Sequence, residues 1–298
     1  MLERLRIVLV RPIRSGNVGA VCRAMANFGL SDLVLVAPRC DHLDAQGVGF
    51  AARALPRLEA ARIVETIPDA LADCVHSFAT SAKGGFYRRN AAIDARAGAR
   101  LAIGAASTGR VAIAFGPEDR GLVLEELLHF DRVIEIPAAP QYPALNLAAA
   151  VTIIAYELLV ASRTATSLAG GPAAGGSGPV SAPDARAVDA QKRVMFERLF
   201  ASLERIGFFR NQQYENHLRL GIRHMLGRLD LSANEADILL GIARQVAWYA
   251  DQAERAAGTS SADRAASADQ AAGADHASSA DHASRGGPRE RRSESTQR

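Results

Sequence analysis

The sequence predicts an α/β fold built on a parallel sheet, followed by a small helical domain and a disordered tail. Short β-branched runs alternate with helical patterns over the first 160 or so residues, which is typical of a parallel α/β domain. A Gly- and Pro-rich stretch then precedes a segment with helical periodicity, and the chain ends in low-complexity sequence. The expected strands cover residues 6–10, 33–37, 75–80, 111–115 and 132–136.

The best-defined helix follows the first expected strand. Asn17 can cap its start and Gly29 can end it. Strand and helix together indicate one βαβ unit. The apolar residues that repeat at helical spacing are Val18, Val21, Cys22, Met25 and Phe28.

Composition shifts divide the rest of the chain. We expect an α/β domain at residues 1–162, a flexible linker at 163–188, a helical extension at 189–253 and a disordered tail at 254–298. The linker contains GGPAAGGSGP, and the tail repeats SADRAASADQAAGADHASSADHAS without a large apolar residue to bury. The extension carries one apolar stripe of Phe196, Leu199, Phe200 and Leu203 and another of Ile238, Leu239, Ile242 and Val246.

Charge and cysteine content narrow the function classes only slightly. A net charge of +3 and a pI near 9.0 permit a nucleic-acid partner without establishing one. Cys22, Cys40 and Cys74 lie far apart, so we expect neither a metal site nor a disulfide framework, and a reducing cytoplasm fits best. The most apolar stretch, residues 145–161, contains Asn146 and Glu157 and is too short for a membrane span, so no membrane association is expected.

Two glycine-containing turns follow expected strands. SGNVGA at residues 15–20 suits an anion at a helix start, but it lacks the GxGxxG spacing of dinucleotide-binding turns. FGPEDRGL at residues 115–122 is spaced like a nucleotide-binding P-loop, but Leu122 and Val123 replace the required Lys and Ser/Thr. Gly116 would permit close approach of a ligand to the sheet. Glu118 would start the next helix, where a carboxylate favours the helix dipole, or would organise a site.

Individual side chains leave the chemistry open. The residue type of Asn146 favours a role as the N-cap of a long Ala-rich helix over a role in ligand contact. Arg23 shares a helix face with Ala20 and Asn27, away from the apolar stripe, so an ordinary surface position is the simplest interpretation. Because no Ser-His-Asp set, metal cluster or carboxylate pair stands at informative spacing, the residues by themselves indicate an α/β ligand-binding domain.

Three ordered motifs together resemble those of the SPOUT RNA 2′-O-methyltransferases. They are SGNVGAVCRAMANFGL at residues 15–30, AFGPEDRGL at 114–122 and IPAAPQYPALNLAAAVTIIAYEL at 136–158. Residues 204–242 are similar to the carboxy-terminal extension of the TrmJ type. The resemblance implies a sheet with a carboxy-terminal trefoil knot, a homodimer, S-adenosyl-L-methionine as cofactor and methylation of a ribose 2′-hydroxyl in tRNA, at nucleotide 32 of the anticodon loop.

The resemblance also assigns roles to residues by motif position. Arg23, Asn146 and Glu118 would be the catalytic residues. The guanidinium of Arg23 would orient an RNA phosphate and make the ribose hydroxyl easier to deprotonate. No metal is needed for this chemistry. The implied cofactor-binding residues are Thr80, Ser81, Ala82, Gly116, Ile136, Pro143, Ala144 and Leu145.

One position departs from the family pattern, since Ala144 stands where related sequences often carry Ser. This leaves two alternatives to a tRNA methyltransferase, namely a ribosomal RNA 2′-O-methyltransferase and a noncatalytic RNA-binding protein of the same fold. The candidates for RNA phosphate contacts are Arg11, Arg14, Arg88, Arg89, Arg219 and Arg223.

Overall fold

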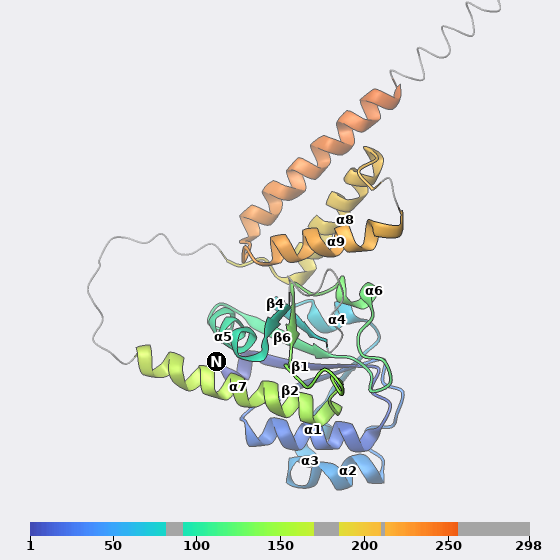
Figure 1. Cartoon of the computed structure of the whole chain (residues 1–298). Helices are drawn as coiled ribbons and strands as arrows, with labels where there is room; N and C mark the ends of the chain where they lie inside the picture. Colours follow the sequence, from blue (N-terminus) through green and yellow to red (C-terminus); the bar gives the residue numbers. More distant parts are fainter. Residues whose placement is uncertain (82–91, 170–184, 210–211, 256–298) are drawn as a thin grey trace, which may run out of the picture. The chain divides into compact units, whose positions relative to one another are not determined.

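The computed structural model of the chain describes residues 1–81, 92–169, 185–209 and 212–255 (Figure 1). The chain divides into two compact units, Met1–Gln245 and Val246–Arg298. Of the second unit, residues 246–255 are described, and they are helical. The fold and the candidate site below belong to the first unit.

A parallel sheet of seven strands forms the centre of this unit, in the order β3-β2-β1-β6-β4-β7-β5. The predicted α/β class is therefore confirmed, as are all five predicted strands. The structure adds the three-residue strands β3 and β5, which were not predicted. The strands are β1 (Leu5–Val10), β2 (Asp32–Val36), β3 (Arg62–Val64), β4 (Cys74–Thr80), β5 (Ala92–Asp94), β6 (Arg110–Phe115) and β7 (Arg132–Glu135).

Helices cover both faces of the sheet (Figure 1). One apolar core lies between the sheet and α1, α3, α5 and α7, and a second lies on the other face against α4, α6 and α9. Because both faces are covered, all six residues of β1 are buried, as expected of a central parallel strand. The helices are α1 (Ser15–Asn27), α2 (Ala45–Ala51), α3 (Leu55–Glu59), α4 (Ile67–Leu71), α5 (Ala95–Ala105), α6 (Leu124–Leu127), α7 (Leu147–Ala169), α8 (Asp189–Arg205) and α9 (Gln212–Gly227), with 3₁₀ turns at Leu2–Arg4 and Ala52–Ala54 and a further helix from residue 233.

The strand order interleaves the second half of the sheet. β7 lies between β4 and β5, whereas β6 returns to lie beside β1. From β4 to β7, strands that are consecutive in the chain are therefore not neighbours in the sheet, which is unusual and consistent with the implied knot. The domain boundaries remain a prediction: α7 continues through Ala169, and residues 170–184 and 256–298 lie outside the described part of the chain.

The first helix begins three residues earlier than predicted. α1 starts at Ser15, with Arg14 at the N-cap position, so the prediction that Asn17 caps the helix is wrong. Asn17 occupies the third helical position, where its side chain is free to bond elsewhere. Gly29 follows the helix end with a φ of +75°, a conformation that favours glycine.

The last helix of the α/β region is longer and more apolar than predicted. Residues 147–166 of α7 are long and apolar enough to cross a membrane by length and composition alone. One side of this helix belongs to the protein core, since Val151, Ile154 and Leu158 are completely buried. Its other side exposes Tyr156 and Val160.

Candidate active site

A cavity of about 230 Å³ opens at the carboxyl ends of β4, β6 and β7 and beside the start of α7. This edge of a parallel α/β sheet is where ligands ordinarily bind. Seven of the eight predicted cofactor-binding residues line the cavity, and Ala82 lies outside the described residues. The lining includes Thr80, Ser81, Gly116, Ile136, Pro143, Ala144 and Leu145, together with Phe115, Glu118, Asp119, Arg120 and Leu122.

Gly116 is required by the loop that forms one wall of the cavity. A Cβ on this residue would lie 2.3 Å from the backbone nitrogen of Leu122 and 2.4 Å from the carbonyl carbon of Gly121. The close approach expected at this glycine is thus an approach of the chain to itself. Gly121 helps the loop to close, because its φ of +71° is accessible mainly to glycine.

Glu118 joins this loop to the first motif. It does not start a helix, as one interpretation of the sequence expected, because α6 begins only at Leu124. Its carboxylate accepts hydrogen bonds from the backbone N–H groups of Ile13, at 2.9 Å, and Arg14, at 3.2 Å. It also accepts one from Asn17 Nδ2 at 2.9 Å. Glu118 therefore holds the amino end of α1 from a distant part of the chain.

Asn146 extends the same hydrogen-bond chain into the third motif. Its Oδ1 accepts from the backbone N–H of Ala148 at 2.9 Å, which confirms the expected role at the start of α7. Its Nδ2 donates to Asn17 Oδ1 at 3.2 Å. Glu118, Asn17 and Asn146 thus connect all three sequence motifs at the rim of the cavity.

Arg23 lies on α1 with its side chain exposed, and it does not line the cavity. It stands six residues beyond Asn17, or about 9 Å along the helix. Within the described part of the chain it makes no hydrogen bond or ion pair. The structure therefore brings Glu118 and Asn146 together but leaves Arg23 apart and available to an anion.

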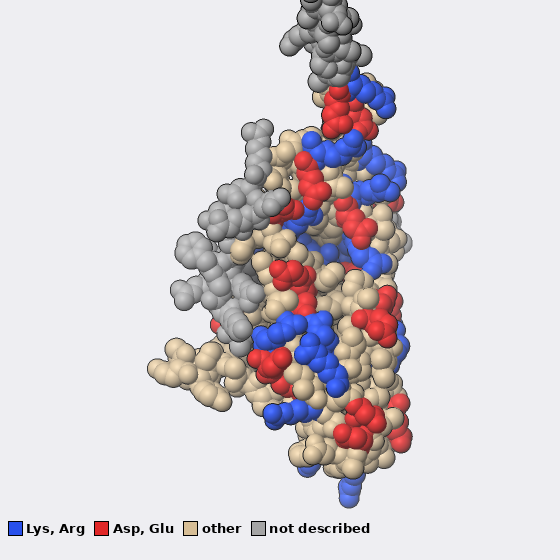
Figure 2. Space-filling view, turned by 90° about the vertical axis from the view of Figure 1, so that its right-hand side faces the viewer, with Lys and Arg blue, Asp and Glu red and all other residues tan. Residues whose placement is uncertain are grey.

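Further arginines gather beside the cavity, and two of them, Arg39 and Arg120, were not singled out in the sequence. Arg120 pairs with Glu126 at 3.2 Å, and Arg39 lies 3.8 Å from Asp119. Burial, with repulsion from Arg120 and Arg39, lowers the pKa of Arg11. Arg11 also contacts Glu126. Figure 2 shows basic and acidic side chains interspersed on one face of the molecule, without a continuous band of one sign.

The arginines expected on α9 are used inside the protein. Arg219 pairs with Glu204 and Glu215 and lies over the Phe200 ring at 5.0 Å. Arg223 is only 5% exposed. Neither side chain is therefore placed to contact RNA phosphates, whereas Arg88 and Arg89 lie outside the described residues.

Comparison with known proteins identifies the family. Residues 4–156, half of the chain, match the model of the SpoU rRNA Methylase family. The chain is 38% identical over 251 residues to the tRNA (cytidine/uridine/adenosine-2′-O-)-methyltransferase TrmJ of Pseudomonas aeruginosa, a match that covers 81% of this chain and 93% of that enzyme. It is 40% identical over 161 residues to the TrmJ of Escherichia coli K12, covering 54% of this chain and 65% of that enzyme.

Solved structures agree with this assignment. The crystal structure of TrmJ from Z. mobilis aligns with a TM-score of 0.64 and 28% identity, over 81% of this chain and 98% of that one. A methylase family protein from Haemophilus influenzae aligns with a TM-score of 0.54 and 32% identity, over 85% of this chain and all of that one. The chain therefore belongs to the SpoU methylase family of SPOUT methyltransferases, whose methyl donor is S-adenosyl-L-methionine.

Proposed function

We propose that this protein transfers a methyl group from S-adenosyl-L-methionine to a ribose 2′-hydroxyl of tRNA, at nucleotide 32 of the anticodon loop. The observation that carries the proposal is the hydrogen-bond chain Glu118–Asn17–Asn146, which joins the three motifs beside one cavity. The similarity to a tRNA 2′-O-methyltransferase over 81% of the chain supports tRNA as the substrate.

The lining of the cavity suits the cofactor by its chemistry. Its walls are largely apolar, with Phe115, Ile136 and Leu145 available to an adenine ring, and backbone groups at the strand ends can bond the polar atoms. The Thr80 hydroxyl donates to the Ala114 carbonyl at 3.0 Å, so it shapes the wall. When bound, S-adenosyl-L-methionine supplies an electrophilic methyl group.

The residues of the chain would position the RNA for in-line attack. Arg23 would bind a phosphate next to the reacting ribose, and its positive charge would favour the deprotonated hydroxyl. Glu118 and Asn146 would act by holding the amino ends of α1 and α7 in place, since their polar atoms are bonded to these helices. Correct placement of the hydroxyl would then provide much of the rate enhancement.

We propose that the active form is a homodimer in the cytoplasm, where tRNA is found. α7 presents an apolar stripe, with Ile153 36% exposed, Tyr156 52% exposed and Val160 40% exposed. An apolar stripe on a helix that already packs against the core favours burial against a second copy.

Two other functions remain in competition. The family model is described for ribosomal RNA, which favours that substrate as the alternative. Ala144 at the cavity wall removes the hydroxyl that related sequences often carry there, which favours a noncatalytic RNA-binding protein.

The test is transfer of labelled methyl from S-adenosyl-L-methionine to unmodified tRNA, followed by mapping of 2′-O-methyl riboses. Arg23→Ala should abolish transfer while cofactor affinity stays unchanged, and Arg62→Ala, an exposed arginine on β3, serves as the control. Methylation of ribosomal RNA and not of tRNA would mean that ribosomal RNA is the substrate. Cofactor binding without any transfer would favour the noncatalytic alternative.

A further inference from the structure

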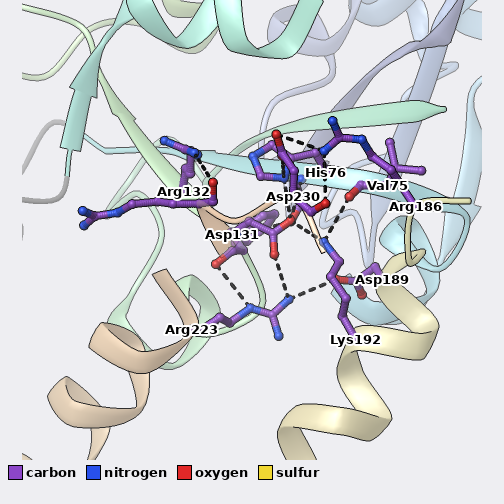
Figure 3. Close-up of polar contacts among 12 residues, drawn as sticks. Val75, His76, Asp131, Arg132, Arg186, Asp189, Lys192, Arg223 and Asp230 are labelled. Atoms are coloured by element: carbon purple, nitrogen blue, oxygen red, sulfur yellow. Dashed lines mark hydrogen bonds and ion pairs between the residues drawn. The ribbon is translucent and has the colours of Figure 1, made fainter. Parts of the chain in front are cut away.

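A buried ionic cluster lies at the amino ends of β4 and β7, which are the ends of these strands opposite to the cavity (Figure 3). Its centre is Asp131, which is completely buried. Asp131 Oδ2 accepts hydrogen bonds from Lys192 Nζ at 2.7 Å and from the Ser77 backbone N–H at 3.0 Å. His76 Nδ1 lies 3.3 Å from the same oxygen.

The cations of this cluster come from the helical extension. Lys192 of α8 is 4% exposed and also donates to the Val75 carbonyl at 3.1 Å. Arg223 of α9 donates to Asp189 of α8 at 2.9 Å and to the His129 carbonyl at 2.6 Å. We call Asp131, Asp189, Lys192 and Arg223 the Asp131 cluster. It fastens both helices to the strand starts.

The surroundings of Asp131 favour its charged form. Burial would raise the pKa of Asp131, but Lys192, His76 and Arg223 outweigh this effect and hold the pKa well below its usual range. Buried ion pairs contribute little net stability compared with apolar packing, yet removing one partner is costly because the other stays buried and unpaired. Such a contact is well suited to holding two elements in one relative position.

The two strands that carry the cluster also reach the cavity. β4 carries His76 and Ser77 near the cluster and ends at Thr80 in the cavity wall. β7 begins just after Asp131 and ends just before Ile136, which also lines the cavity. Ser77 and Thr80 are three residues apart, or about 10 Å along a strand. The Asp131 cluster therefore fixes the position of the helical extension relative to the cavity, because the two are connected by the short, hydrogen-bonded strands β4 and β7.

The extension lies beyond residues 4–156, which match the methylase family, so it is an addition to the common catalytic domain. Its arginines Arg198 and Arg228 are exposed, on α8 and just after α9. A large folded RNA offers one reacting ribose among many similar ones, so selection needs contacts remote from that ribose, and phosphate contacts supply such positioning.

We propose that the Asp131 cluster is a positioning device for RNA. It holds the helical extension as a second RNA-contacting element at a fixed distance from the methyl-transfer cavity, and Lys192 and Arg223 act through the extension without touching the substrate. The inference rests on the proposed function, because it takes RNA as the ligand.

The test is the double variant Asp131→Asn/Lys192→Met in the full chain, which removes the central ion pair without leaving either charge unpaired. We expect the Kd and the KM for tRNA to rise about tenfold, equivalent to about 1.4 kcal/mol of binding free energy. The kcat at saturating tRNA and the Kd for S-adenosyl-L-methionine should stay within about twofold. Backbone hydrogen exchange should increase in α8 and α9.

The matched control is Arg6→Met/Asp73→Asn. Arg6 of β1 is 2% exposed, and its Nη1 lies 2.6 Å from Oδ1 of Asp73, whose side chain is 48% exposed. The described contacts of this partly buried ion pair do not connect it to α8 or α9. It should lower the melting temperature without changing the KM for tRNA.

Three outcomes would overturn the proposal: an unchanged KM for tRNA in the Asp131 variant, an equal rise in the control, or loss of cofactor binding together with RNA binding. Direct tRNA binding is measured without turnover. If the wild-type protein binds tRNA but does not methylate it, the proposed function fails, whereas weaker binding by the Asp131 variant still supports the positioning role.

Discussion

Glu118 Oε1 and Asn17 Nδ2 are 2.9 Å apart, and this hydrogen bond connects the loop after β6 to the first turn of α1. The carboxylate at the same time accepts from two backbone N–H groups just before and at the helix start. An anion at a helix amino end satisfies groups that have no partner within the helix and favours the helix dipole. Glu118 thus serves the candidate site through the geometry of α1.

Glu118→Gln should weaken this connection, because a neutral amide accepts less strongly and turns an NH₂ group towards other donors. We expect the free energy of unfolding to fall by about 2 kcal/mol, in the range of hydrogen bonds to charged groups. Methyl transfer should fall at least about tenfold. Chemical denaturation and the methyl-transfer assay check both numbers. The exposed Glu125→Gln variant on α6 is the control and should change neither.

Gly116→Ala should close the cavity wall incorrectly, since the new Cβ would meet the backbone of Leu122. The expected result is at least about a tenfold loss of affinity for S-adenosyl-L-methionine, measured by calorimetry. The control is Gly104→Ala in α5, where a Cβ meets nothing within 4 Å. That variant should gain up to about 1 kcal/mol of stability from helix propensity. Equal cofactor affinity in the two variants would contradict the assignment of the cavity.

The sequence predicted the fold class and the longer strands better than the contacts within the site. All five apolar runs became strands, because burial on both faces demands continuous apolar sequence. β3 and β5 were missed because three residues carry too short a pattern, and in β3 Arg62 and Ile63 are both exposed. Asn146 was placed correctly because helix caps are local features.

Contacts between distant segments could not be predicted. The sequence placed Asn17 as a helix cap and Glu118 at a helix start, yet the two bond each other across 101 residues. Asp131 and Lys192 are 61 residues apart, and each looks like an ordinary charge in its own segment. One signal was present: Lys192 is one of only two lysines, beside Lys83, in a chain that otherwise uses arginine.

The joint between α9 and the α/β domain should weaken in acid. Burial, followed by the opposing effect of Asp131 and repulsion from Arg223, lowers the pKa of His224 to about 4. Since the pKa of histidine in the unfolded chain is about 6.5, the unfolded state binds the proton first as the pH falls. The stability contribution is therefore complete above about pH 6.5 and is lost as the pH falls towards 4. Below that pH the loss stays constant.

His224→Gln removes this titration and shows its size. Between pH 7 and pH 4.5 the wild-type free energy of unfolding should fall by about 2–3 kcal/mol more than that of the variant. Urea unfolding at the two pH values measures the difference. If wild type and variant lose stability in parallel, His224 is not the neutral buried group that its 4% exposure indicates.

The exposed stripe on α7 tests the proposed homodimer. Tyr156→Glu places a charge in the middle of Ile153 and Val160, and a charge in an apolar interface is costly to bury. We expect the variant to sediment as a monomer while it still binds S-adenosyl-L-methionine. Ile63→Glu, at a residue 50% exposed on β3, is the control and should remain dimeric. A wild-type monomer would contradict the proposal directly.

If the homodimer forms, Arg23 should act on the cavity of the other copy, because it does not line the cavity of its own chain. At a concentration of S-adenosyl-L-methionine too low for Gly116→Ala to bind it, Arg23→Ala and Gly116→Ala are each inactive alone and can then complement each other when they are co-expressed. Random pairing makes half of the dimers mixed, and each mixed dimer has one intact site of two, so activity should recover to about a quarter of wild type. Measured methyl transfer near zero in the mixed sample would place Arg23 in its own chain's site, reached by a movement of the side chain along α1.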